Sequence, residues 1–74
     1  MKVAVIGAGS WGTALAQTLA LNGHNVSLWA RKDSVVHGIN HEHVNPRYLS
    51  DAKLSENIVA TTSYRDALLR AKAA

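Results

Sequence analysis

Apolar positions along the chain follow two different periods, which predicts strands that alternate with helices. Three runs have the length and the apolar or alternating pattern of short buried strands: residues 2–6, 25–30 and 58–61. Three other stretches have the pattern or boundary residues of helices: residues 10–22, residues 34–42, and residues 64 to the end. The predicted order is therefore β-α-β-α-β-α.

The first predicted helix has recognisable ends. Ser10 is a candidate N-cap, because a hydroxyl there accepts a hydrogen bond from a free N–H of the first turn. Gly23 is expected to end the helix, since glycine adopts the left-handed conformation without a Cβ clash. Ala14, Thr18 and Leu21 fall on one side between these ends, and Leu15 and Leu19 lie close by at a spacing of four residues.

This order predicts an α/β fold, namely one half of a Rossmann-type parallel sheet with right-handed crossovers. The expected spatial order of the strands is 3-2-1, and a fourth strand would lie beside the first. Without it, residues 3–6 would present an unpaired apolar edge, which native proteins avoid. A domain of 74 residues also has a marginal core. We therefore expect residues 1–74 to be the N-terminal part of a dinucleotide-binding domain, truncated before the fourth strand, with the substrate and catalytic domain absent.

A G-x-G-x-x-G turn connects the first predicted strand to the first helix. Gly7 permits the sharp turn, Gly9 allows backbone to approach a pyrophosphate, and Gly12 allows the helix to pack closely on the strand. Free N–H groups and the positive end of the helix dipole face the phosphates, and Ser10 adds a hydroxyl. Trp11 is either a core or lid aromatic or a wall of the cofactor site. The turn predicts binding of a dinucleotide.

The end of the second predicted strand carries positive charge. NAD-preferring sites of this fold place Asp or Glu about 20 residues beyond the glycine turn, on the ribose 2′-hydroxyl. Here Arg31 and Lys32 stand at the strand end, and Asp33 comes later. Cations at this point attract a 2′-phosphate. The expected cofactor is NADP(H), with NAD(H) also possible; the alternative is two solvated charges at a strand end.

Composition excludes several other classes of protein. The formal net charge is only +3, and its eight Lys and Arg residues are scattered, whereas a nucleic-acid module shows a dense basic face. Cysteine is absent, and no apolar run is long enough for a signal peptide or a membrane span. We therefore expect a cytoplasmic protein that binds a small phosphorylated ligand and has no nucleic-acid or membrane partner.

Two further features are less specific. His37 and His41 have a spacing of four residues and His43 follows, but no cysteine or H-E-x-x-H pattern accompanies them. A polar helix that exposes histidines explains them better than a metal site, so no metal is predicted. Residues 45–49 form either a structural connection or a loop over the adenine side of the cofactor, and composition does not decide between them.

Four segments of the chain are informative together: G-A-G-S-W-G-T-A-L-A at 7–16, W-A-R at 29–31, N-P-R-Y-L at 45–49 and A-T-T at 60–62. In these segments the chain closely resembles the N-terminus of bacterial-type NAD(P)-dependent glycerol-3-phosphate dehydrogenases. The resemblance implies an enzyme that interconverts dihydroxyacetone phosphate and sn-glycerol 3-phosphate for phospholipid synthesis. It implies cofactor contacts from Ser10, Trp11, Arg31 and Lys32, with Tyr48 as a further candidate.

The resemblance also limits what this chain is expected to do. Catalytic lysines and the substrate phosphate site of the family lie in later segments, so no residue here is assigned a catalytic role and the chain alone is expected to be inactive. Another Rossmann dehydrogenase, related to ketopantoate reductase or 6-phosphogluconate dehydrogenase, is one alternative. A non-catalytic nucleotide-binding module is another. A homo-oligomer is left open.

Overall fold

Three parallel strands form the sheet in the computed structural model, which describes residues 1–47 and 53–69. They are β1 (Lys2–Ile6), β2 (Asn25–Trp29) and β3 (Ile58–Thr61). Central β2 pairs with β1 on one side and with β3 on the other, with Val3 opposite Val26 and Leu28 opposite Ala60. The predicted spatial order 3-2-1 is confirmed, and the arrangement is Rossmann-like.

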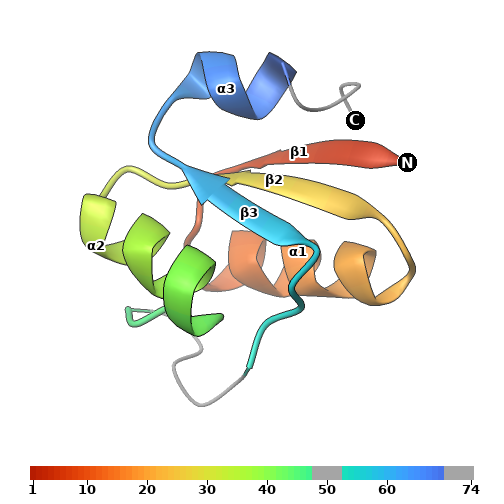
Figure 1. Cartoon of the computed structure of the whole chain (residues 1–74), viewed down its shortest axis with the longest axis horizontal. Coiled ribbons are helices and arrows are strands. Elements are labelled where there is room, and N and C mark those ends of the chain that lie inside the picture. Colours follow the sequence, from red (N-terminus) through yellow and green to blue (C-terminus); the bar gives the residue numbers. More distant parts are fainter. Residues whose placement is uncertain (48–52, 70–74) are drawn as a thin grey trace.

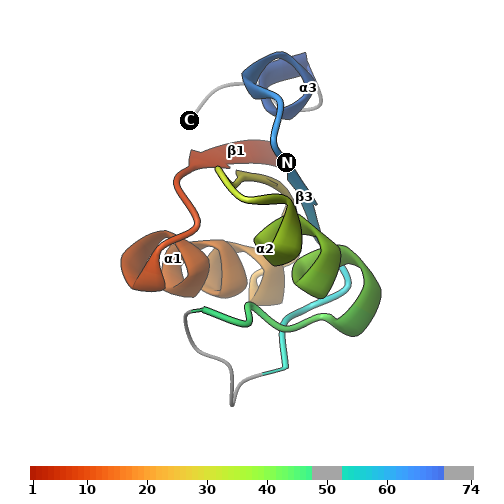
Figure 2. The ribbon, with the colours of Figure 1, turned by 90° about the vertical axis from the view of Figure 1, so that its left-hand side faces the viewer.

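Helices cover both faces of the sheet (Figures 1 and 2). One face carries α1 (Ser10–Leu21), α2 (Asp33–His37) and a π-helical turn, η1 (Gly38–Glu42). Helix α3 (Tyr64–Leu69) lies on the opposite face. The short helix expected over 34–42 is therefore an α-helix followed directly by a wider turn. Among the described residues, no helix is both long and apolar enough to cross a membrane.

The core lies between the sheet and the helices α1, α2 and η1. Its strand residues are the alternate positions that face these helices: Val5, Val26, Leu28, Ile58 and Ala60. From α1 the buried residues are Thr13, Ala16 and Ala20. The side that carries Ala14, Thr18 and Leu21 is exposed, Leu21 at 71%, whereas the neighbouring Leu19 is partly buried against the core. The buried positions of α1 carry small side chains because the helix packs closely on the sheet. The spacing of large apolar residues in the sequence does not reveal these positions.

The N-terminus of α1 also differs from the prediction. Gly9, in an extended conformation, is the N-cap residue, and no side chain of the described residues forms a capping hydrogen bond. Ser10 is already the first helical residue, so its hydroxyl does not occupy the N-cap position. The first turn of α1 contains no acidic side chain. The beginning of the helix therefore keeps the positive character of its free N–H groups.

Other helix ends match their local sequence. Gly23 has a φ of +90°, and its N–H donates to the carbonyl oxygen of Ala20 at 3.0 Å, as predicted for a helix that ends at glycine. At the start of α3, the N–H of Asp66 donates to the hydroxyl oxygen of Ser63 at 3.1 Å. These contacts fix the directions in which the chain leaves α1 and enters α3.

Side-chain amides form hydrogen bonds with backbone groups that are not paired within the sheet. Asn40 donates from Nδ2 to the carbonyl oxygen of Ala60 at 2.9 Å and accepts the N–H of Ala60 at Oδ1, 2.7 Å away. This amide therefore occupies the outer edge of β3, as a neighbouring strand would. Gln17 does the same for a loop, because its Oε1 accepts the N–H of Ser55 at 2.7 Å.

Candidate functional site

The turn between β1 and α1 requires glycine at two positions. Gly7 has a φ of +111°, which side chains rarely tolerate, and its N–H donates to the carbonyl oxygen of Trp29 at 3.1 Å. A Cβ on Gly12 would collide with the carbonyl oxygen of Gly7. Close packing of α1 against the turn, which the sequence predicted from the third glycine, is therefore observed.

Gly9 has a different role from the other two glycines. A Cβ on this residue would meet no atom of the described residues within 4 Å, and its backbone is extended, so the described fold does not demand glycine here. The open space lies at the beginning of α1, where N–H groups and the helix dipole favour an anion. Absence of a side chain at Gly9 therefore keeps the approach to these N–H groups clear.

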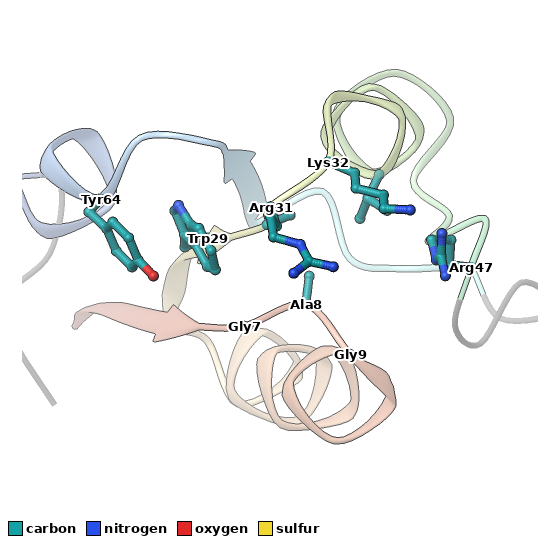
Figure 3. A pocket seen from close by; sticks show the side chains of 10 residues that line it. Gly7, Ala8, Gly9, Trp29, Arg31, Lys32, Arg47 and Tyr64 are labelled. Atoms are coloured by element: carbon teal, nitrogen blue, oxygen red, sulfur yellow. The ribbon is translucent and has the colours of Figure 1, made fainter.

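A pocket of about 460 Å³ opens at the carboxyl ends of the strands, beside the turn. Figure 3 shows it from close by. Its walls come from the glycine turn, the end of β2, the start of α2, the loop before residue 48, and α3: Gly7, Ala8, Gly9, Trp29, Ala30, Arg31, Lys32, Val35, Arg47 and Tyr64. This is the edge at which open parallel sheets bind their ligands.

Positive charge dominates the pocket. Arg31, Lys32 and Arg47 line it, and no acidic side chain is found among its described lining residues. In Figure 3 the guanidinium of Arg31 lies above Ala8, while Lys32 and Arg47 lie toward one end. Cations grouped around a helix N-terminus suit phosphate groups.

Aromatic side chains lie at the other end of the pocket (Figure 3). The rings of Trp29 and Tyr64 are stacked, with centroids 4.2 Å apart and an angle of 9° between their planes. Nε1 of Trp29 donates to the carbonyl oxygen of Thr62 at 2.8 Å, which fixes the indole. A flat, fixed aromatic surface beside cations is suited to a ligand that carries both a planar base and phosphates.

The structure brings together part of the predicted site. Gly7, Gly9, Arg31 and Lys32 all line the pocket. Three other predicted contacts lie on the same turn and helix start but are not among the pocket-lining residues: Ser10, Trp11 and Gly12. Trp11 is 81% exposed, so it is not a core aromatic. Tyr48 lies outside the described residues.

Sequence reasoning missed four residues of this region. The predicted cofactor contacts do not include Trp29 or Tyr64, and Arg47 is predicted only as part of the loop at 45–49. Asn45, also in that loop, is fully buried against the turn. Position at the carboxyl end of a predicted strand was a signal available for Trp29. The contacts of the other three depend on segments far apart in the sequence.

Asn45 and Arg47, at the start of the predicted loop 45–49, have different environments, and residues 48 and 49 lie outside the described residues. Asn45 is buried and bonded to the turn and to α1, which is a structural role, whereas Arg47 faces the pocket. The histidines form no comparable arrangement. Rings of His37 and His41 lie 4.5 Å apart, and within the described part of the chain no three potential metal ligands are grouped together.

A parallel sheet in this strand order, with a glycine turn and a pocket at its carboxyl edge, defines a Rossmann-like domain of the nucleotide-binding type. The family model described as "NAD-dependent glycerol-3-phosphate dehydrogenase N-terminus" matches residues 2–74. The chain belongs to this family.

Similar proteins agree with this assignment. The glycerol-3-phosphate dehydrogenase [NAD(P)+] of Limosilactobacillus reuteri is 51% identical over 67 residues, which are 90% of this chain and 20% of that protein. Its counterpart in Nitratidesulfovibrio vulgaris is 53% identical over 68 residues, or 92% of this chain and 21% of that protein. The chain thus spans about a fifth of the length of these relatives.

A solved structure is also similar. The crystal structure of glycerol-3-phosphate dehydrogenase from Coxiella burnetii superimposes with a TM-score of 0.85 at 38% identity, covering 95% of this chain and 22% of that one. These matches favour the glycerol-3-phosphate dehydrogenases over the two alternatives, another Rossmann dehydrogenase or a non-catalytic module.

Proposed function

We propose that this chain is the N-terminal, cofactor-binding part of an NAD(P)-dependent glycerol-3-phosphate dehydrogenase. The whole enzyme would interconvert dihydroxyacetone phosphate and sn-glycerol 3-phosphate in the cytoplasm, for phospholipid synthesis. One observation carries the proposal: the glycine turn and the cations after β2 line the same pocket. The chain belongs to a family defined by the N-terminus of such enzymes and covers about a fifth of its relatives. Both facts support the proposal that the substrate-binding and catalytic groups lie outside residues 1–74.

The roles of the pocket residues follow from their positions. The pyrophosphate would lie at the N–H groups that begin α1, where Gly9 leaves room and Ser10, Trp11 and Gly12 form the first turn. When bound, the cofactor supplies the hydride chemistry, and the protein binds and orients it. Tyr48 remains a predicted contact. We assign no catalytic residue within this chain.

We further propose that the site prefers NADP(H) and also accepts NAD(H). Arg31 and Lys32 line the pocket at the end of β2, where an NAD-specific site would place a carboxylate. Asp33 belongs to the first turn of α2 and is not among the pocket-lining residues. Two adjacent cations, with no acidic side chain among the described residues that line the pocket, support recognition of a 2′-phosphate.

Oxidation of NADPH and NADH by the full-length protein tests the proposed activity. We expect cofactor oxidation that depends on dihydroxyacetone phosphate, with a higher kcat/KM for NADPH than for NADH. In the reverse direction, sn-glycerol 3-phosphate should support reduction of the oxidised cofactor. The matched controls are ketopantoate and 6-phosphogluconate with the corresponding cofactor, which should give no turnover. Turnover of either control substrate in place of dihydroxyacetone phosphate would contradict the proposal.

A further inference from the structure

A buried amide joins three separate segments beside the pocket. Nδ2 of Asn45 donates to the carbonyl oxygen of Ala8 at 3.0 Å and to Oγ1 of Thr13 at 2.8 Å. Oδ1 of Asn45 accepts the backbone N–H of Arg47 at 3.1 Å. The glycine turn, helix α1 and the loop are therefore connected through one side chain.

This connection resists displacement. Asn45 and Thr13 both have no exposed surface, so a shift of the loop would leave buried polar groups without partners. Gly38 of η1 limits the same loop from the other side: a Cβ there would lie 2.7 Å from Cδ of Pro46 and 2.8 Å from the carbonyl oxygen of Val44. The backbone that leads to Arg47 is thus held between the turn and η1.

The backbone of Arg47 is therefore held by different contacts from those that position the other two cations of the pocket. Arg31 and Lys32 follow β2, where the ribose 2′ position is recognised in this fold. The backbone of Arg47 is instead tied through Asn45 to Ala8, inside the turn that receives the pyrophosphate. Its side chain lines the same pocket as Gly9, and Figure 3 shows it beside Lys32 toward one end of that pocket.

We propose that Arg47 binds the cofactor pyrophosphate and that Asn45 is the positioning residue that holds it there. The proposal rests on the proposed function, because it takes the pocket as a dinucleotide site. A guanidinium offers paired N–H donors that match phosphate oxygens, and the fixed loop reduces the entropy lost on binding. The other source of phosphate oxygens in the pocket is a 2′-phosphate, which NADPH carries and NADH lacks.

The dissociation constants of NADH and NADPH for Arg47→Gln distinguish the two phosphates. We expect both constants to rise by the same factor, about tenfold, because the pyrophosphate is common to both cofactors. Arg47→Lys, which keeps the charge but loses the paired donors, should show a smaller rise for both. A rise confined to NADPH would assign Arg47 to the 2′-phosphate and overturn the proposal, as would unchanged affinity for both cofactors.

Substitutions at Thr13 test the role of Asn45 without removing the buried amide. Thr13→Val takes away the hydroxyl that accepts from Asn45, whereas Thr13→Ser retains it. We expect Thr13→Val to raise the dissociation constants of both cofactors severalfold. Thr13→Ser, which keeps the hydroxyl, should bind both with wild-type affinity. In the Arg47→Gln background the effect of Thr13→Val should shrink, since residues that act through one another are not additive. Full additivity, or no recovery with serine, would contradict the positioning role.

Asn40→Ala is the control for a purely structural effect. Asn40 also makes two bonds to backbone, but at the edge of β3 and away from the pocket-lining residues. It should lower stability without changing either dissociation constant. Wild-type protein that binds neither cofactor would refute the proposed function itself, whereas normal binding by both wild type and Arg47→Gln would refute only the assignment of Arg47.

Discussion

Arg31 stands where NAD-specific sites of this fold carry an acidic residue, and it lines the pocket. Arg31→Glu should therefore raise the dissociation constant for NADPH by about tenfold or more, because a carboxylate would repel the 2′-phosphate. The constant for NADH should change much less. Fluorescence titration of the full-length protein measures both.

A control for this substitution needs the same change in charge at another place. Arg65 is exposed on α3 and is not among the pocket-lining residues, so Arg65→Glu should leave both constants unchanged. If Arg31→Glu does not change the ratio of the dissociation constants of NADPH and NADH, the assignment of Arg31 to the 2′-phosphate is wrong.

Gly9 and Gly12 should respond differently to alanine. A Cβ at Gly12 would overlap the carbonyl oxygen of Gly7, so Gly12→Ala should lower the free energy of unfolding by about 1–3 kcal/mol. Gly9→Ala should leave stability almost unchanged, because a Cβ there meets nothing, and yet weaken cofactor binding. Denaturant unfolding and cofactor titration of both variants separate the two roles. Wild-type affinity in stable Gly9→Ala would exclude a pyrophosphate at this turn.

Elements of the fold were predictable wherever one local rule was sufficient. The three strands and the glycine that ends α1 follow from apolar runs and backbone conformation within a few residues. The buried face of α1 was not predictable in this way, because the sheet selects the small Ala16 and Ala20 at close contact. Ser10 could not be placed as an N-cap or first helical residue from its identity alone.

The outer edge of β3 gives a prediction at this scale. Asn40 pairs with both the N–H and the carbonyl oxygen of Ala60, so Asn40→Ala leaves two backbone groups of an edge strand without partners. The free energy of unfolding should fall by about 1–3 kcal/mol in urea denaturation. Asn22→Ala is the control, because it removes only an exposed hydrogen bond from Nδ2 of Asn22 to the carbonyl oxygen of Thr18. It should lower the free energy of unfolding by less than about 0.5 kcal/mol. Equal losses would contradict the role of Asn40.

Across the whole molecule, the pocket was only partly predictable. Spacing within one turn identified Gly7 and Gly9, and position after a strand identified Arg31 and Lys32. The stacking of Trp29 on Tyr64 joins residues from two elements, and Asn45 reaches residues more than 30 positions away. Such contacts depend on the folded arrangement of the sheet and helices, which no local pattern contains.

The isolated chain should be marginally stable. It has few residues with which to form a core, and large apolar side chains remain exposed beside and on α3, among them Ile6 at 49% and Leu68 at 51%. We expect a broad thermal transition by circular dichroism and weak NADPH binding for residues 1–74 expressed alone. A sharp cooperative transition with low-micromolar affinity would show instead that residues 1–74 fold and bind the cofactor on their own.

We propose that the turn at residues 7–12 holds the pyrophosphate of a dinucleotide. A crystal structure of the full-length protein with NADPH would show whether the pyrophosphate lies there. We expect pyrophosphate oxygens about 2.7–3.2 Å from backbone nitrogens at the start of α1, with the 2′-phosphate beside Arg31 and Lys32. A cofactor bound elsewhere, with these N–H groups facing only solvent, would contradict it.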